Sequence, residues 1–368
     1  MKPDVPIESV KAQAFTVPTD RPEADGTIAW NATTLVVVEI SAGGRSGLGY
    51  TYSSACIVEL IRGTLAETIK GKDALAPQAA FAMMERAVRN LGREGLAATA
   101  ISAVDTALYD LKARLLDVPL ASLLGTCRGS VPIYGSGGFT TYSDSELEQQ
   151  LGGWVTEQGC KFVKMKIGSE PARDPHRVEV AKSAIGDATL FVDANGAYGP
   201  KQAIALAEEF AHQDVGWFEE PVSSDDLAGL AMVRNYAPVG MEIAAGEYAY
   251  TTDYVRTMLQ ERAVDVQQAD ATRCGGYTGF LQIAALCDAF HVDLSGHCAP
   301  ALHLHVACAA PRLRHLEWFH DHVRIEHMLF DGAPRPRNGQ IAPDLTRAGN
   351  GLTFKRADAA RYAVSGAS

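Results

Sequence analysis

From residue 131 onward the sequence alternates short apolar runs with amphipathic segments, and no other feature constrains the fold as much. Eight apolar runs lie at residues 131–134, 162–166, 190–193, 216–219, 241–245, 264–268, 292–295 and 315–318. Helical spacing of apolar residues marks the segments 144–158, 174–185, 200–214, 225–236, 252–261 and 279–290, and a shorter crossover spans 301–310. Alternating strands and helices predict a parallel sheet, and eight strands in about 190 residues favour a closed (β/α)8 barrel of the TIM type over an open sheet.

The residues before the barrel have a mixed α+β pattern. Extended stretches at 7–17 and 33–41 flank a polar segment, and Gly43-Gly44 predicts a hairpin turn into 47–51. Three helical patterns follow, at 56–70, 77–91 and 96–115. We expect a capping domain at 1–125, a catalytic barrel at 126–322 and a C-terminal segment at 323–368 that returns to the cap.

Charge and composition exclude several kinds of partner. Forty-four Asp and Glu against 33 Lys and Arg leave a net charge of −11, which would repel nucleic acid and anionic membrane surfaces. No apolar run approaches the roughly 20 residues of a membrane helix, and the polar start Met1-Lys2-Pro3-Asp4 resembles no signal or transit segment. Seven scattered cysteines without a Cys-x-x-Cys pair argue against disulfides and a zinc knuckle. We therefore expect a cytoplasmic protein.

Acidic residues follow three consecutive strands of the predicted barrel. Asp193, Glu219 and Glu247, hereafter the acid triad, stand 26 and 28 residues apart, close to one strand and helix unit each. Because parallel strands end at one mouth, the three carboxylates should converge and repel one another unless a cation neutralises them. An all-oxygen set favours Mg²⁺ over zinc. The alternatives are separate helix-capping roles, or ligation by the neighbouring Glu220 and Glu242, which strand alternation disfavours.

Candidate bases flank the acid triad. The two-residue period of a strand places Lys164 and Lys166 on the same inward side. A lysine beside another lysine and a divalent cation should have a lowered pKa, as a general base requires. On the other side, Asp270 could orient His297 and raise its basicity, and Glu317 would complete the ring as an acid or hydrogen-bond donor.

Together these residues resemble the enolase superfamily, and within it the mandelate racemase subgroup. The resemblance covers nearly the whole chain and is carried by these segments: AVDTALYDL at 103–111, KMKIG at 164–168, VDAN at 192–195, WFEEP at 217–221, GE at 246–247, DATRCGG at 270–276, SGH at 295–297 and HLE at 315–317. The interval before Glu247 is longer than in the family pattern, which indicates an insertion in that loop.

The resemblance implies a role for each candidate residue. The acid triad matches the ligands of Mg²⁺. Lys166 and the His297–Asp270 pair match bases on opposite faces of the substrate. Lys164 matches the lysine that holds the substrate carboxylate, and Glu317 matches the glutamate that hydrogen-bonds the developing enediolate. Homo-oligomers are common in this family, so we expect one here.

The shared chemistry of the family is removal of a proton α to a carboxylate. With two bases present, we expect dehydration of a hydroxylated sugar acid to a 2-keto-3-deoxy acid; racemisation, epimerisation or cycloisomerisation of a 2-hydroxy or sugar acid is the alternative. The segments 20–31 and 50–54 should close over the site and recognise the far end of a small carboxylate substrate. Trp30, Tyr52 and Asn195 are the candidate substrate contacts.

Two other protein classes fit less well. A zinc amidohydrolase barrel would use a His-x-His pair, and such pairs occur at 303–305 and 320–322. That chemistry expects the pair on the first strand, which has none. A non-catalytic barrel would not need the lysines and the acid triad together. The glycine-rich segment 135–138 is a weak dinucleotide motif, because Thr140 stands where a third glycine should be.

Overall fold

The computed structural model describes residues 5–364 and contains a closed barrel of eight parallel strands. The strands are β4 (Val131–Gly137), β5 (Phe162–Lys166), β6 (Thr189–Asp193), β7 (Val215–Glu219), β8 (Glu242–Ala245), β9 (Val266–Ala269), β10 (Asp293–Gly296) and β11 (Leu313–Phe319). Each pairs with its sequence neighbour, and β11 pairs with β4 to close the ring. The predicted (β/α)8 barrel is therefore confirmed, with strand ends shifted by a few residues.

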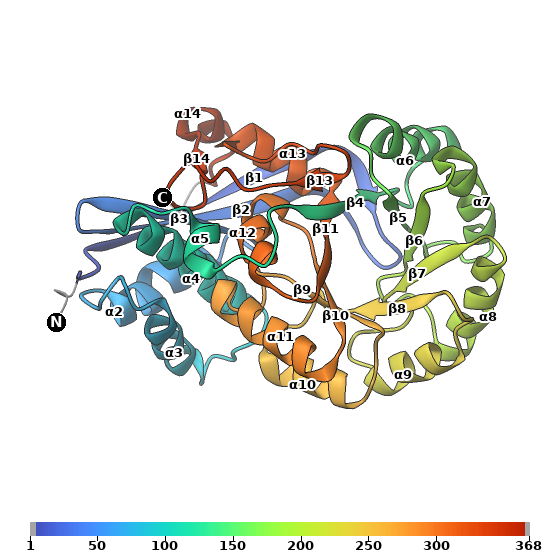
Figure 1. Cartoon of the computed structure of the whole chain (residues 1–368), viewed down its shortest axis with the longest axis horizontal. Helices are drawn as coiled ribbons and strands as arrows, with labels where there is room; N and C mark the ends of the chain where they lie inside the picture. Colours follow the sequence, from blue (N-terminus) through green and yellow to red (C-terminus); the bar gives the residue numbers. More distant parts are fainter. Residues whose placement is uncertain (1–4, 365–368) are drawn as a thin grey trace.

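Helices surround the barrel, as Figure 1 shows on its right side. They are α6 (Asp144–Gln158), α7 (Asp174–Ile185), α8 (Pro200–Ala211), α9 (Leu227–Tyr236), α10 (Thr252–Gln260), α11 (Gly276–Phe290) and α12 (Pro300–Ala309). Local sequence sets the bounds of α6: Ser143 and Glu146 cap each other's backbone N–H groups, and Gly159 ends the helix with a φ of 71°. Such local signals explain why α6 and α7 match their predicted bounds.

Apolar and aromatic side chains fill the barrel below its mouth. Tyr134, Phe191 and Trp217 pack there with Ala244 and Val266. The Lys164 ammonium lies 5.5 Å from the ring centre of Tyr134, directly against this layer. The barrel is thus a packed core rather than a pore, and the His315 ring is part of its aromatic layer.

The capping domain is an antiparallel sheet covered by helices. Its strands are β1 (Ser9–Ala24), β2 (Ala29–Ala42) and β3 (Arg45–Tyr52), in that order. Gly43 and Gly44 form the predicted turn with φ values of 56° and 73°, which favour glycine. Helix α4 (Leu96–Leu115) lies directly on β3, since a Cβ atom at Gly49 would stand 2.4 Å from the Ala103 carbonyl oxygen.

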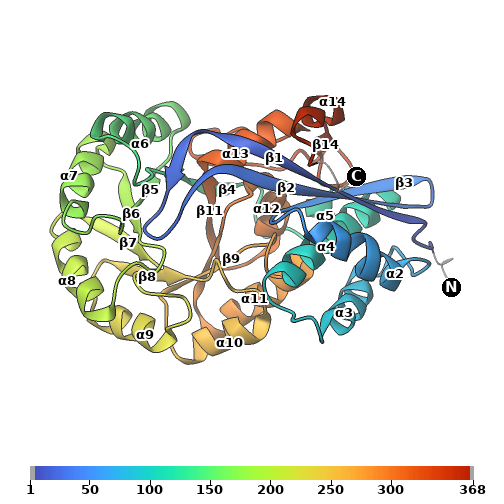
Figure 2. The same cartoon turned by 180° about the vertical axis from the view of Figure 1, so that it is seen from behind.

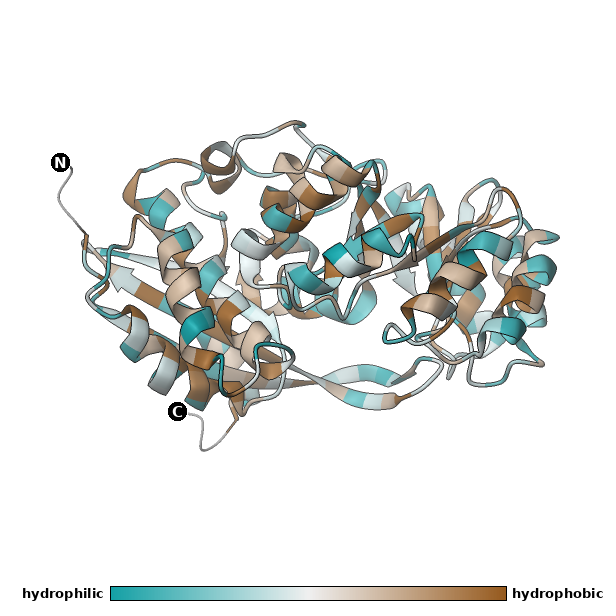
Figure 3. Cartoon of the chain, turned by 90° about the horizontal axis from the view of Figure 1, so that it is seen from below, coloured by the Kyte–Doolittle hydropathy of each residue, from teal (hydrophilic) through white to brown (hydrophobic). Residues whose placement is uncertain are grey.

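The hairpin of β1 and β2 is longer than the predicted extended stretches at 7–17 and 33–41. The segment 20–31 continues both strands, with a register shift between Pro18 and Glu23 and a turn in which Asp25 accepts the backbone N–H groups of Thr27 and Ile28. The hairpin reaches from the cap to the barrel (Figure 2), and its far part is mainly polar (Figure 3). Strand pairing satisfies the backbone N–H and C=O groups of this part without an apolar face. The alternation of apolar and polar residues that usually marks a strand is therefore missing from its sequence.

Two further differences concern helices. The predicted helix 56–70 is divided into α1 (Ile57–Leu60), a π-helical turn at Ile61–Leu65 and α2 (Ala66–Ile69), whereas α3 (Pro77–Val88) follows its predicted pattern closely. The short α5 (Leu120–Leu124), which links the cap to β4, was not predicted.

The tail returns to the capping domain. After α13 (His320–Leu329), β12 (Phe330–Asp331) pairs with β14 (Thr353–Phe354), β13 (Gln340–Ile341) pairs with β4, and α14 (Arg356–Ala359) follows. The Val364 N–H donates to the Ala14 carbonyl oxygen at 3.0 Å, which ties the tail to β1. Helix α13 runs through residue 322, and the exact domain boundaries stay predictions.

Within residues 5–364 no helix combines the length and apolar character needed to cross a bilayer. Residues 1–4, the polar start noted in the sequence, lie outside the described residues.

Candidate active site

The structure brings the acid triad together at the barrel mouth. Asp193 ends β6, Glu219 ends β7 beside it, and Glu247 follows β8. One carboxylate oxygen from each residue lies within 4.8 Å of the others, and all three side chains are buried. Burial and the Asp193 charge raise the pKa of Glu219 to about 8.

The alternative ligands lie elsewhere. Glu242 begins β8 at the opposite end of the strand, and its carboxylate accepts a hydrogen bond from Arg314 at 2.6 Å. Glu220 is buried with a φ of 36° and is absent from the group of converging ligand atoms. The candidate cation site therefore consists of the acid triad alone.

Both inward lysines contact the acid triad. The Lys164 ammonium pairs with Glu219 and lies 3.2 Å from Asp193, and the Lys166 ammonium lies 2.5 Å from Asp193. Burial alone would lower the pKa of each lysine, but the carboxylates outweigh it and raise both. This differs from the expected lowering, which assumed that a divalent cation takes up the charge of the carboxylates.

His297 approaches from the other side of the mouth. Lys166 ends β5, and His297 follows β10. In the ring of strands, β4 and β11 lie between β5 and β10 on one side, and β6 to β9 lie between them on the other. Asp270 accepts a hydrogen bond from His297 Nδ1 at 2.8 Å, which leaves Nε2 facing Glu247 at 3.3 Å. Burial would lower the pKa of His297, but the surrounding negative groups, including Glu247 and Glu317, raise it well above its usual value.

Glu317 joins the two sides. Its Oε1 accepts hydrogen bonds from Lys164 at 2.8 Å and from the Ser136 hydroxyl at 2.6 Å, and its Oε2 accepts the Cys298 N–H at 2.9 Å. Burial would raise the pKa of Glu317, but the charges of Lys164 and His297 lower it. Its expected role as a hydrogen-bond donor requires the protonated form, which these cations disfavour.

A cavity of about 340 Å³ opens above these groups. Catalytic candidates Lys166, His297 and Glu317 line it together with Glu247 of the acid triad, and all three substrate candidates, Trp30, Tyr52 and Asn195, line it as well. The other predicted residues, Lys164, Asp193, Glu219 and Asp270, are buried beneath it. The hairpin turn contributes Asp25 and Ile28, so part of the cavity wall comes from the cap.

Several cavity residues were not predicted, among them Arg273, Cys298 and His322. Arg273 lies 3.4 Å from a Glu247 oxygen and packs over the Tyr248 ring, and Cys298 follows His297. His322 stacks on Tyr52 with ring centres 3.5 Å apart, and burial lowers its pKa to about 3. The motif DATRCGG contains Arg273, and His322 belongs to the second His-x-His pair. The sequence motifs therefore included both residues but did not place either of them at the cavity.

The first His-x-His pair forms no shared site. His303 Nε2 accepts the Ala271 N–H at 2.7 Å, whereas His305 Nε2 hydrogen-bonds the Asn350 carbonyl oxygen at 2.9 Å. Both imidazoles thus satisfy buried backbone groups, which does not support the amidohydrolase alternative.

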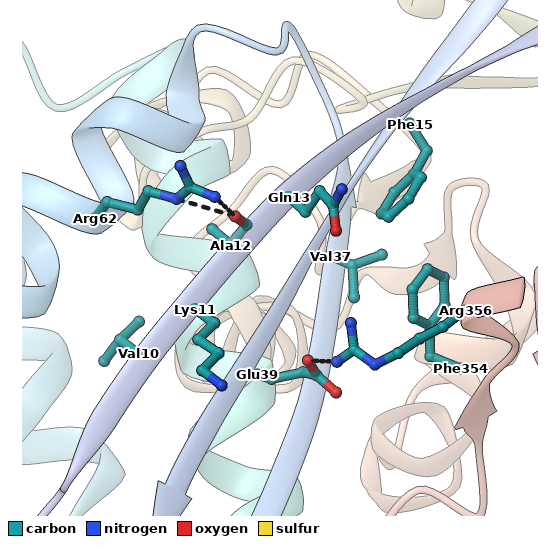
Figure 4. Close-up of a pocket in the computed structure, with 10 residues that line it drawn as sticks. All are labelled: Val10, Lys11, Ala12, Gln13, Phe15, Val37, Glu39, Arg62, Phe354 and Arg356. Carbon is teal, nitrogen blue, oxygen red and sulfur yellow. Dashed lines mark hydrogen bonds and ion pairs between the residues drawn. The ribbon is translucent and has the colours of Figure 1, made fainter. Parts of the chain in front are cut away.

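A second cavity, of about 440 Å³, lies on the cap away from all predicted residues (Figure 4). Beside it Arg62 donates to the Ala12 carbonyl oxygen, and Arg356 pairs with Glu39. Both arginines that line it are thus paired.

Comparisons with known proteins agree with this architecture. Residues 10–125 match the mandelate racemase/muconate lactonizing enzyme N-terminal domain, and residues 146–359 match the enolase C-terminal domain-like family. The chain is 31% identical to L-talarate/galactarate dehydratase of Salmonella typhimurium, over 89% of this chain and 85% of that protein. It is 30% identical to 3,6-anhydro-alpha-L-galactonate cycloisomerase of Streptomyces coelicolor, over 95% and 98%.

Two solved structures are also similar. A mandelate racemase/muconate lactonizing enzyme-like protein from Rubrobacter xylanophilus has a TM-score of 0.95 at 49% identity, covering 98% of this chain and 100% of that chain. A racemase from Streptomyces coelicolor with bound magnesium has a TM-score of 0.91 at 30% identity, covering 97% and 100%. The relatives are enzymes: acid-sugar dehydratases, cycloisomerases and racemases. This chain therefore belongs to the mandelate racemase/muconate lactonizing enzyme group of the enolase superfamily.

Proposed function

We propose that this protein is a Mg²⁺-dependent acid-sugar dehydratase. It removes the proton α to a carboxylate and eliminates water from the next carbon, which gives a 2-keto-3-deoxy acid. The observation that carries the proposal is the gathering of the acid triad, Lys166 and the His297–Asp270 pair around one cavity. The dehydratases among the relatives support it.

The acid triad fits a magnesium ion. Its donors are all carboxylate oxygens, the set that hard cations prefer. When bound, Mg²⁺ would supply positive charge beside the substrate carboxylate, where the negative charge of an enediolate develops. The similar racemase structure with bound magnesium supports this assignment.

Two groups of the chain can then move protons. Lys166 reaches the mouth from β5, and His297 follows β10, so each can approach a different face of a bound acid. Asp270 holds His297 so that Nε2 faces the cavity. Lys166 in its neutral form would take the α-proton, and protonated His297 would deliver a proton to the departing hydroxyl.

Lys164 and Glu317 hold the reacting end of the substrate. Lys164 is buried and charged beneath the cavity, within reach of a carboxylate that replaces part of its contact with the acid triad. The wall provided by the cap is rich in hydroxyl groups, including Thr33, Ser53 and Tyr52. A polyhydroxylated chain would find hydrogen-bond partners along this wall, which favours a sugar acid over a bare aromatic acid.

Cycloisomerisation is the second candidate. The Streptomyces coelicolor cycloisomerase aligns over 98% of its own length, slightly more completely than the dehydratase does. Racemisation or epimerisation requires two bases on opposite faces, and the positions of Lys166 and His297 allow it as well.

Product analysis separates these reactions. The protein is incubated with Mg²⁺ and a panel of sugar acids in deuterated water. A 2-keto-3-deoxy product supports dehydration. Deuterium at the α-carbon with inverted configuration indicates an epimerase, and an isomer with a new ring or an opened ring, of unchanged mass apart from the deuterium taken up, indicates a cycloisomerase. If no acid in a broad panel exchanges its α-proton, the proposed proton abstraction is wrong.

A further inference from the structure

The thiol of Cys298 lies at the cavity wall and has no part in the proposed mechanism. Cys298 follows His297 with a φ of 51°, and its side chain is buried at the edge of the cavity. Its Sγ lies 3.3 Å from His297 Nε2 and 3.4 Å from Glu317 Oε2. The His297 Nε2 to Glu317 Oε2 distance is 3.5 Å, so the three atoms form a nearly equilateral triangle.

This triangle has the dimensions of one face of a tetrahedral zinc site. Zinc binds sulfur at about 2.3 Å, and nitrogen and oxygen at about 2.0–2.2 Å, so its ligand atoms stand about 3.4–3.6 Å apart. The two edges to sulfur, 3.3 and 3.4 Å, are about 0.2 Å shorter than the ideal values, and the Nε2 to Oε2 edge of 3.5 Å is about 0.1 Å longer. The ligands would therefore need very little rearrangement.

The other bonds of these side chains leave the three atoms available. Asp270 holds Nδ1 of His297, so Nε2 is free to bind a metal, and a carboxylate that orients a histidine in this way is common around zinc. The Oε1 atom of Glu317 already accepts from Lys164 and Ser136, whereas Oε2 accepts the Cys298 N–H at 2.9 Å and keeps a second lone pair for the metal. The cavity beside them leaves room for water as a fourth ligand.

We propose that His297, Cys298 and Glu317 form a second cation site, which takes Zn²⁺ and is distinct from the acid triad. Bonds form from zinc to the thiolate sulfur, the imidazole nitrogen and the carboxylate oxygen. The thiol proton leaves to solvent, as does any proton on Nε2. Mg²⁺ does not compete well here, because hard cations bind thiolate and imidazole poorly, whereas the acid triad offers only oxygen.

Zinc at this site would inhibit the enzyme. It would occupy His297 Nε2, the atom that faces the cavity, and so remove this group from proton transfer. This consequence rests on the proposed function, whereas zinc binding itself does not.

Cobalt absorption tests the binding. Co²⁺ replaces zinc in such sites, and a bound thiolate adds a sulfur-to-cobalt charge-transfer band in the near ultraviolet. The background protein carries Cys56→Ser and Cys127→Ser, because both these thiols are exposed. It is titrated with Co²⁺ in excess Mg²⁺, which keeps the acid triad occupied. We expect a band at one equivalent, and its loss when Cys298→Ser is added.

A second variant protects the test against misfolding. In His297→Asn the thiol remains, but the nitrogen ligand is lost, so Co²⁺ affinity should fall at least tenfold. Circular dichroism verifies the fold of each variant. No band in the background protein, or an unchanged band after Cys298→Ser or Cys298→Ala, would overturn the site. If the band behaves as expected and Zn²⁺ leaves formation of the 2-keto-3-deoxy product unaffected, the site stands and the proposed role of His297 fails.

Discussion

Two groups of buried carboxylates can be compared. One lies at the barrel mouth, the other lies where the cap meets the barrel and the C-terminal segment, and the two groups are neutralised differently. At the mouth, the acid triad converges within 4.8 Å. The carboxylates around the cap lie apart from one another, and each accepts hydrogen bonds from its own donors. They are Asp105, Asp110 and Glu326.

The carboxylates around the cap join distant parts of the chain. Asp110 on α4 accepts N–H groups from Leu48 at 2.7 Å and Asn350 at 2.6 Å, together with the Arg114 side chain. Glu326 on α13 accepts the Tyr50 hydroxyl at 2.6 Å and the Ala301 N–H at 3.1 Å. These groups satisfy buried donors, so Asp110 holds the C-terminal segment on the cap, and Glu326 joins the cap to α12.

The comparison shows which carboxylates serve the fold and which serve chemistry. A carboxylate surrounded by donors stabilises the structure that supplies them. Carboxylates that face one another repel, and such an arrangement is retained where binding or catalysis requires it. Four variants or conditions would break or sharpen this distinction.

The largest effect is expected from the bases at the mouth. Lys166→Ala or His297→Asn should lower turnover by about 10²- to 10⁴-fold, the usual contribution of a general acid or base. Unfolding temperature and the stabilisation by Mg²⁺ should persist, because the acid triad is intact. Lys201→Ala, an exposed lysine on α8, is the matched control and should retain full turnover. Near-normal turnover in both test variants would contradict the assignment.

Removal of the carboxylate between the cap and the C-terminal segment should act on stability instead. Asp110→Ala leaves two buried N–H groups and Arg114 without their partner, so the free energy of unfolding should fall by about 3 kcal/mol. Denaturant titration measures this loss. Asp358→Ala, at an exposed position in α14, should change stability by less than about 0.5 kcal/mol. Equal losses in the two variants would refute the distinction.

Magnesium should stabilise the mouth. At a hundredfold excess over its dissociation constant, Mg²⁺ should raise the free energy of unfolding by about 2.7 kcal/mol. Thermal unfolding with Mg²⁺ and with EDTA measures the effect. Glu219→Gln removes one charge of the acid triad and should greatly weaken the stabilisation. If Glu219→Gln responds to Mg²⁺ as fully as the unaltered protein, the cation binds elsewhere.

The pH dependence of stability should report Glu326. Burial raises its pKa to about 8 from an ordinary value of 4.5. The folded protein then keeps a proton that the unfolded chain has lost, so this contribution is fully present below pH 4.5 and declines as the pH rises towards 8. Glu326→Gln should reduce the decline by up to about 1.4 kcal/mol per pH unit. Denaturant titrations between pH 5 and 8 compare the slopes, and identical slopes would contradict the assignment.

Much of the barrel and of its mouth could be predicted. The strand and helix periods are local properties, so β5, α6 and α7 were placed within their observed bounds. Alternation along β5 placed Lys164 and Lys166 on one side, and the spacing of one unit per strand placed the acid triad at one mouth. In the hairpin of β1 and β2 this reasoning failed, because its polar end is held by strand pairing and contact with the barrel rather than by an apolar face.

The sequence by itself determined the repeating architecture and which acids, lysines and histidine end the strands, because both follow from the periods of neighbouring residues. Only the tertiary structure decided the contacts between residues far apart in the chain. It placed Trp30 and Tyr52 over the barrel, stacked His322 on Tyr52, and set the Cys298 sulfur against His297 and Glu317. Such distances depend on how the barrel closes and how the cap docks, and no local period encodes them.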